Sequence, residues 1–165
     1  LIRLPHVKFT IADYNRLCLS VAFWESIPTE NILVFQRDGC PLHLSPHKIT
    51  DFLEYDYVGA PWCHRNEQDP LAYRVGNGGF SFRKRSAMIK ALNSPDHPHE
   101  DRPEDLYFSY ICRDLLHIAP FEVGCAFSVE EDHGYVIPFG FHKYRHVVTE
   151  VTRGTPEIWY LQQTF

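Results

Sequence analysis

The sequence predicts one α/β domain, in which buried strands alternate with helices. Apolar residues recur at helical spacing from Thr10 to about Ile27. The unbroken apolar run 32–35 is typical of a strand covered on both faces. Helical patterns return at 86–92 and from Pro103 to about Leu116. With 165 residues, the chain corresponds to a single domain spanning 1–165.

The first two elements define the expected centre of the fold. Thr10 is a suitable N-cap for the first helix, and Pro28 lies just beyond the helix end. The strand 32–35 stops abruptly at a polar loop. We therefore expect it in the interior of a mixed, mainly parallel sheet, with the helix 10–27 packed on one face.

The later elements follow from shorter patterns. The segment 57–62 predicts another strand, and residues 75–83 combine three glycines with the strand-like run 80–82. Pro103 suits the first helical position, with two acids in the first turn. Weaker signals indicate a short element at 127–129, a turn at 133–134 and a segment at 138–142.

Composition excludes several classes of protein. The chain is 44% apolar, with 12 Phe, 9 Tyr and 3 Trp, which is enough apolar surface for one core. Its net charge of −5 argues against a general nucleic-acid surface. No apolar run approaches the roughly 18 residues of a membrane helix. Because the first residue is Leu, we expect a fragment of a longer chain.

The five cysteines are irregularly spaced and form no C-x-x-C pair. This pattern favours free buried thiols over a disulfide scaffold or zinc ribbon. It points to a reducing compartment such as the cytoplasm, although the lumen of the secretory pathway stays open.

Two segments are candidates for binding phosphate or substrate. Asp38 directly follows a buried strand, where an acid can hold a divalent cation, or can simply form an Asp-Gly turn. In the segment 75–81, three glycines let backbone N–H groups approach a substrate and allow positive φ. The alternative for that segment is a structural bulge or turn.

Acids and histidines further along the chain add candidates. Glu104 and Asp105 suit either a helix start or, for one of them, a general base. His142 ends a largely apolar segment and is either a ligand or a structural histidine. A remote alternative is an iron triad of His97, His99 and Asp101, but these lie in a Pro-rich loop without a strand framework.

Taken together and in order, these blocks resemble a glycosyltransferase-like domain family. The resemblance runs from about Tyr14 to Lys143. It rests on these segments: Phe23-Trp24, Leu33 to Asp38, Tyr55 to Trp62, Val75 to Ser81, Pro103-Glu104-Asp105, Phe127 to Glu130 and Phe139 to Lys143. The order of blocks is also similar to that of GT-A transferases such as the β-1,4-galactosyltransferases.

The resemblance implies a GT-A-like mixed sheet with flanking helices, whose nucleotide-binding strands should precede Leu1. It also implies that Asp38 and His142 hold a divalent cation, with Gln36 standing where the first acid of the metal motif would be. By the same likeness Glu104 and Asp105 form the acidic catalytic pair, with Asp105 as the base. The substrate-binding residues it implies are Gly76, Asn77, Gly78, Gly79, Trp62 and Gln36.

The implied reaction transfers a sugar from a nucleotide-sugar donor to an acceptor hydroxyl. A divalent cation stabilises the departing diphosphate, and mixed oxygen and nitrogen ligands favour Mn²⁺ over Mg²⁺. Trp62 and Phe80 are candidates for stacking on a sugar, or for burial in the core. Gln36 and the missing N-terminal strands favour the alternative of a catalytically silent module with an assembly or binding role.

Overall fold

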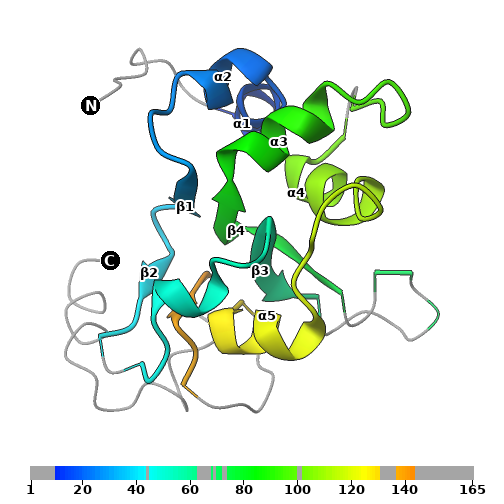
Figure 1. Cartoon of the computed structure of the whole chain (residues 1–165). Helices are drawn as coiled ribbons and strands as arrows, with labels where there is room; N and C mark the ends of the chain where they lie inside the picture. The colour runs from blue at the N-terminus through cyan, green and yellow to red at the C-terminus, as the bar shows by residue number, and fades with distance from the viewer. Residues whose placement is uncertain are drawn as a thin grey trace.

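The computed structural model describes residues 10–43, 45–62, 68, 70–71, 74–99, 102–130 and 137–143, arranged as small sheets with flanking helices (Figure 1). The helical elements are α1 (Ile11–Cys18), α2 (Val21–Glu25), η1 (Ile49–Phe52), α3 (Arg85–Leu92), α4 (Glu104–Leu106), η2 (Tyr107–Ile111) and α5 (Phe121–Phe127). The strands are β1 (Asn31–Phe35), β2 (Cys40–Pro41), β3 (Tyr57–Pro61), β4 (Val75–Lys84), β5 (Ser128–Val129) and β6 (Gly140–Phe141).

The main sheet has the order β1-β4-β3 and both of its strand pairs are antiparallel. The prediction of an interior strand in a mainly parallel sheet at 32–35 was therefore wrong: within the described residues β1 pairs with β4 alone. The apolar run arises because both faces of β1 are covered, Ile32 and Val34 by one core cluster and Leu33 by the other. A strand can be covered on both faces even when only one of its two edges is hydrogen-bonded to another strand.

A second, smaller sheet lies beside the first and has the order β2-β6-β5. Strand β2 is antiparallel to β6, with Cys40 opposite Phe141, and β5 is parallel to β6, with Val129 opposite Phe141. Each strand has only two residues. The sheet brings together three segments that are far apart in the sequence.

The predicted helix 10–27 is two helices, α1 and α2. Thr10 caps α1 as expected, through a capping box in which the backbone N–H of Asp13 donates to the Thr10 hydroxyl and the Thr10 N–H donates to Asp13. The break follows Cys18, whose carbonyl accepts a hydrogen bond from the Trp24 indole at 2.7 Å. The indole thus satisfies a helix-end carbonyl that a continuous helix would have used internally.

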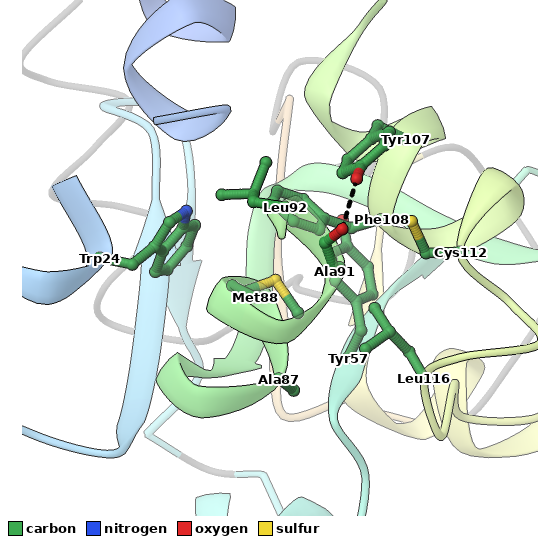
Figure 2. Close-up of a cluster of buried hydrophobic side chains, with 10 residues drawn as sticks. All are labelled: Trp24, Tyr57, Ala87, Met88, Ala91, Leu92, Tyr107, Phe108, Cys112 and Leu116. Carbon is green, nitrogen blue, oxygen red and sulfur yellow. Dashed lines mark hydrogen bonds between the residues drawn. The ribbon is translucent and has the colours of Figure 1, made fainter. Parts of the chain in front are cut away.

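Two hydrophobic clusters cover the two faces of the main sheet. Figure 2 shows the first, formed between the sheet, α2, α3 and η2; its buried members are Trp24, Tyr57, Ala87, Met88, Ala91, Leu92, Tyr107, Phe108, Cys112 and Leu116. The second, under η1 and α5, contains Phe52, Val58, Val75, Phe80, Phe82, Ala119 and Phe127. Phe80 is fully buried there, with its ring 5.4 Å from that of Phe127, so its predicted alternative role in sugar stacking is excluded in favour of the core.

Other predicted elements are close to those observed. The strand 57–62 and the helix 86–92 are confirmed as β3 and α3. Pro103 is the N-cap of α4 rather than its first residue, and the helix continues as the π-helical turn η2. The sequence analysis missed α5, and the turn predicted at 133–134 lies outside the described residues.

The prediction of buried thiols is confirmed for Cys18 and Cys112, whereas Cys40 and Cys125 are half-buried. Cys63 lies outside the described residues. Among the helices that the structure describes, none is long and apolar enough to cross a membrane.

Candidate functional site

The glycine-rich segment is part of β4, which changes register at this point. Gly59 of β3 pairs with Ser81, but the next residue, Ala60, pairs with Asn77. The residues between them form a bulge, which the Ser81 hydroxyl closes by donating to the Gly78 carbonyl at 3.1 Å. None of the glycines in β4 has a left-handed φ, so the bulge alternative is confirmed and the expected positive φ is not found.

The glycines of β4 are required because side chains from other elements occupy the space where a Cβ would be. A Cβ at Gly76 would lie 2.2 Å from the Trp62 ring, and one at Gly79 would lie 1.9 Å from the His142 imidazole. At Gly78 it would meet the Glu104 carboxylate at 2.3 Å. Three side chains that the sequence analysis singled out therefore rest directly on this backbone.

Asp38 and His142 lie together, as predicted, with the His142 Nε2 atom 3.4 Å from the Asp38 Oδ1 atom. The small sheet explains this, because Asp38 lies two residues before β2 and His142 directly follows β6, in register. The Gln36 side-chain oxygen is 3.2 Å from the same His142 nitrogen. The His142 side chain is 5% exposed, whereas that of Asp38 is 45% exposed, so the group opens toward solvent.

The surroundings of His142 determine which of its nitrogens carries the proton. The Gly79 N–H donates to the Asn77 side-chain oxygen at 3.0 Å, which fixes that atom as an acceptor. His142 Nδ1 is 3.1 Å from the same oxygen and 3.4 Å from Glu130 Oε1. Nδ1 therefore carries the proton, and in the neutral ring the Nε2 lone pair faces Gln36 and Asp38.

This donor set fits a small divalent cation. Two ligands of one cation at about 2.1 Å are themselves about 3.0 to 3.4 Å apart, which is the separation found between His142 Nε2 and the two oxygens. In the neutral tautomer, the Nε2 atom has no hydrogen to donate to the two oxygens that face it. A cation bound between these three atoms would accept a lone pair from each of them. The described residues contain no group of three or more His, Cys, Asp or Glu side chains arranged to hold a metal, so a third donor from the described residues would have to be the Gln36 side-chain oxygen.

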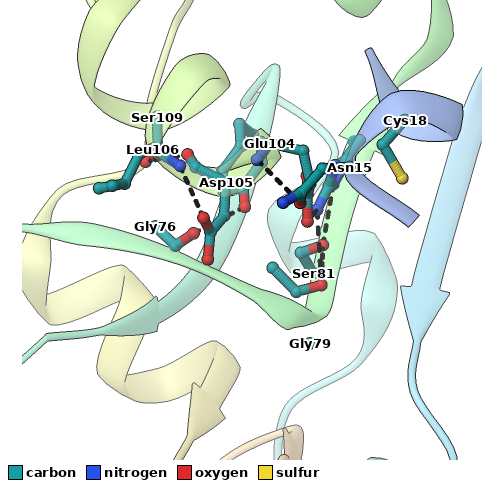
Figure 3. A network of polar contacts seen from close by, with 12 residues as sticks. Asn15, Cys18, Gly76, Gly79, Ser81, Glu104, Asp105, Leu106 and Ser109 are labelled. Atoms are coloured by element: carbon teal, nitrogen blue, oxygen red, sulfur yellow. Dashed lines mark hydrogen bonds and ion pairs between the residues drawn. The ribbon is translucent and has the colours of Figure 1, made fainter. Parts of the chain in front are cut away.

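Asp105 lies against the glycine segment, in the first turn of α4 (Figure 3). Its carboxylate accepts hydrogen bonds from the N–H groups of Leu106, at 2.8 Å, and Gly78. Burial raises the pKa of Asp105, and the neighbouring Glu104 charge raises it further against the opposing effect of these hydrogen bonds. A raised pKa makes this carboxylate a better proton acceptor than an exposed Asp.

Glu104 has a different environment from its neighbour. Both of its oxygens accept from Arg83, and its backbone N–H donates to the Asn15 side chain at 3.3 Å. Arg83 is fully buried, with its guanidinium 4.9 Å from the centre of the Tyr57 ring. Burial lowers the pKa of Arg83, but the Glu104 charge and hydrogen bond, together with the neighbouring Tyr57 and Tyr14, outweigh it and the net shift of the pKa is upward. Of the two carboxylates, that of Glu104 accepts hydrogen bonds from Arg83, whereas that of Asp105 accepts them from backbone N–H groups.

The two parts of the site approach β4 from opposite faces. Gly78 contacts Glu104 and Asp105, and Gly79 contacts His142. The two glycines lie in the bulge, where the strict alternation of side chains is interrupted. Their contacts define the two parts: Glu104 and Asp105 adjoin η2, whereas His142 adjoins Asn77 and Gln36. The Gln36 N–H donates to the Gly79 carbonyl at 2.8 Å, one residue beyond the β1–β4 ladder, so the β1-side edge of β4 is hydrogen-bonded as far as Gly79.

Residues 2–142 of the chain match DUF5672, a family described as proteins of unknown function. The chain belongs to this family. The matched range includes Asp38, the glycine segment, Asp105 and His142. No curated protein and no solved structure matches the chain significantly.

In this DUF5672 chain, the sequence analysis did not single out two buried charged residues that contact the site. Arg83 continues the strand pattern 80–82 as an ordinary outward-facing polar residue, and only the fold places it in the core. Glu130 follows the short strand β5, in the same way that Asp38 follows β1, and this position was an available signal.

The two described residues of the remote iron triad, His97 and His99, make other contacts. The two ring nitrogens of His97 contact the Ser94 hydroxyl at 2.8 Å and Asp114 at 2.9 Å. The His99 ring packs edge-on against Tyr107, 5.7 Å away, and Asp101 lies outside the described residues. His97 is therefore part of a local turn that ties the loop to the end of η2.

Proposed function

We propose that this chain is a glycosyltransferase domain of GT-A type, which moves a sugar from a nucleotide-sugar donor to an acceptor hydroxyl with the help of a divalent cation. One observation carries the proposal. The Asp105 carboxylate, whose pKa is raised, and the His142 imidazole, which adjoins Asp38 and Gln36, contact adjacent glycines, Gly78 and Gly79, of one bulged strand. Sugar transfer needs these two parts, a proton acceptor and a group that stabilises a leaving diphosphate, a short distance apart.

Asp38, His142 and Gln36 would hold the cation, with Mn²⁺ preferred to Mg²⁺ because one donor is an imidazole nitrogen. When bound, the cation supplies charge stabilisation for the departing diphosphate. Glu130 and Asn77 keep the proton on His142 Nδ1, so that Nε2 stays available as a ligand. Gly79 lets the imidazole lie against the strand.

Asp105 would act as the general base in an inverting transfer. Its carboxylate accepts the proton of the acceptor hydroxyl while that oxygen forms a bond to the anomeric carbon and the nucleoside diphosphate leaves with the bonding electrons. The Gly78 and Leu106 N–H groups orient the carboxylate. Arg83 holds Glu104 in place beside it, and Trp62, resting on Gly76, offers an aromatic surface for a sugar.

The test is calorimetric titration with Mn²⁺ and with UDP- and GDP-sugars, followed by turnover assays on the full-length protein. We expect Asp105→Asn to reduce turnover on the order of 10²-fold or more with donor affinity nearly unchanged. Asp96→Asn, an exposed change of the same chemistry, is the matched control. Normal turnover of the Asp105 variant would remove this residue from the mechanism.

The alternative function, a catalytically silent module with an assembly or binding role, is favoured by Gln36. A neutral amide stands where the resemblance places an acid, which weakens the cation site. The same titration distinguishes the two functions. A silent module would bind neither Mn²⁺ nor a nucleotide sugar.

A further inference from the structure

A basic and aromatic cluster on the surface is not used by the mechanism above. It consists of Arg74, Tyr110 and Arg113. The guanidinium carbons of Arg74 and Arg113 lie 5.5 and 4.4 Å from the centre of the Tyr110 ring. Both arginines are exposed, and each is anchored by a hydrogen bond of 2.6 Å to a backbone carbonyl, that of Pro70 or of Tyr110.

Among the described residues, the cluster is anchored by carbonyl oxygens and not by carboxylates. Arg16 and the half-buried Arg85 differ from it, because they contact Asp13 and Glu30. Within the described residues, neither Arg74 nor Arg113 forms an ion pair with a carboxylate. Asp114, the sequence neighbour of Arg113, contacts His97 and attracts the Arg113 charge through space, without an ion-pair contact. Two guanidiniums held over one ring by carbonyl anchors are a preorganised site for an anion.

The cluster adjoins the Asp105 side of the site. The Trp62 backbone N–H donates to the Arg74 carbonyl at 3.0 Å, and the Trp62 ring rests on Gly76. Ser109, the neighbour of Tyr110, also contacts Gly76 and donates from its hydroxyl to the Asp105 carbonyl at 2.6 Å. The cation site lies against the opposite face of β4, so a donor diphosphate held there would not occupy this cluster.

We infer that Arg74, Tyr110 and Arg113 form an acceptor subsite for an anionic saccharide, one that carries a phosphate or carboxylate group. The role of this saccharide as an acceptor rests on the proposed function. Gly78 is four residues beyond Arg74, about 13 Å along an extended strand, so an acceptor of about disaccharide size would place its charge on the arginines and a hydroxyl near Asp105. Trp62 lies between the two points.

The chemistry of the cluster ranks the acceptors. Guanidinium groups form paired hydrogen bonds with both carboxylates and phosphates, and a phosphate monoester carries the larger charge at neutral pH. We therefore expect phosphorylated sugars to bind more tightly than uronates, and neutral sugars to bind weakest. The affinity should fall as salt concentration rises.

The test measures binding alone, by calorimetry and NMR titration without metal or donor. The probes are glucose 6-phosphate, glucuronate, glucose and inorganic phosphate. We expect the double variant Arg74→Gln/Arg113→Gln to lose on the order of 10-fold or more in affinity for glucose 6-phosphate. Tyr110→Leu, which keeps both charges, should lose several-fold. Arg85→Gln removes the same charge at the other end of β4 and should have no effect.

Two results would overturn the inference. Equal affinity for inorganic phosphate and glucose 6-phosphate would show an anion site without sugar recognition, and unchanged affinity in the double variant would place binding elsewhere. Failure of the proposed function has a different signature. Binding of glucose 6-phosphate through the arginines, without any binding of Mn²⁺ or nucleotide sugars, would support the saccharide subsite and overturn the transfer reaction.

Discussion

Two pairs, each of one acidic and one basic side chain, lie on opposite faces of β4, and they differ in their exposure to water. Arg83 and Glu104 are almost fully buried, with side chains 0% and 4% exposed, and Arg83 is surrounded by aromatic rings. His142 and Asp38 are 5% and 45% exposed, and Asp38 lies in a surface turn. One pair is closed off from water, and the other is open on one side.

The difference separates a structural role from a functional one. A buried pair cannot exchange its partner without leaving a charge in the core, so Arg83 and Glu104 hold β4 and α4 together. An open pair loses little when a cation replaces one contact, because water reaches the carboxylate. Mutations on the two faces should therefore have opposite profiles, with large effects on stability on one face and large effects on binding on the other.

The largest effect is expected for Arg83→Met. It leaves the Glu104 charge buried without a partner, which costs about 3 to 5 kcal/mol in the free energy of unfolding, measured by urea denaturation. In the double variant Arg83→Met/Glu104→Leu no charge is left in the core, and we expect most of the stability to return. A single variant as stable as the double one would show that the pair is not closed to water.

A smaller effect is expected for Gly79→Ala. The new Cβ would lie 1.9 Å from the His142 imidazole, which must move, at a cost of about 1 to 3 kcal/mol. Because His142 leaves its place, Mn²⁺ affinity measured by calorimetry should fall as well. Gly76→Ala is the matched control, since its Cβ would lie 2.2 Å from the Trp62 ring and away from His142, so it should cost stability and leave Mn²⁺ affinity unchanged. Unchanged Mn²⁺ affinity in Gly79→Ala would argue against His142 as a ligand.

Asp38→Asn tests the open pair directly. The free energy of unfolding should change by less than about 1 kcal/mol, because the carboxylate is substantially exposed. Mn²⁺ affinity should fall on the order of 10-fold or more, since a charged ligand becomes neutral. The exposed change Asp51→Asn, in the turn η1, should leave Mn²⁺ affinity intact. A large loss of stability without loss of Mn²⁺ binding would reverse the assignment of the two faces.

The smallest effect concerns the pH dependence of stability at Asp105. Its pKa is raised by burial and then by Glu104, so the folded protein binds this proton more tightly than the unfolded chain. The stabilisation is complete below the ordinary pKa of Asp and is lost as pH rises through the raised value. Asp105→Asn should therefore match the wild type in stability near pH 4 and exceed it at pH 7. Equal stability at both pH values would contradict the raised pKa.

The predicted proximity of Asp38 and His142 is confirmed, whereas the predicted sheet is not. The order of blocks in the sequence indicated that Asp38 and His142 converge, and their side chains are in contact although 104 positions separate them. The strand at 32–35 was located correctly but placed wrongly in the sheet. Residue patterns report which faces of a strand are covered, and they contain no information on which strand pairs along its edge.

The glycines of the segment 75–79 show the same difference between what the sequence indicates and what the fold decides. Their number in 75–79 marked the segment as unusual, and a bulge was one of the two expected explanations. Which side chains need the space is a property of other elements, since Trp62, Glu104 and His142 all come from elsewhere in the chain. No local rule assigns those partners.

The sequence by itself determined the capped start of α1, the strands β1 and β3, the helix α3 and the acids at the start of α4, because these depend on neighbouring residues only. Tertiary structure decided the rest. It made Glu104 a buried partner of Arg83 and left Asp105 with a raised pKa, and it set the proton of His142 through Asn77 and Glu130. Burial and charge depend on what surrounds a side chain in space, and in this chain those surroundings come from segments that are distant in sequence.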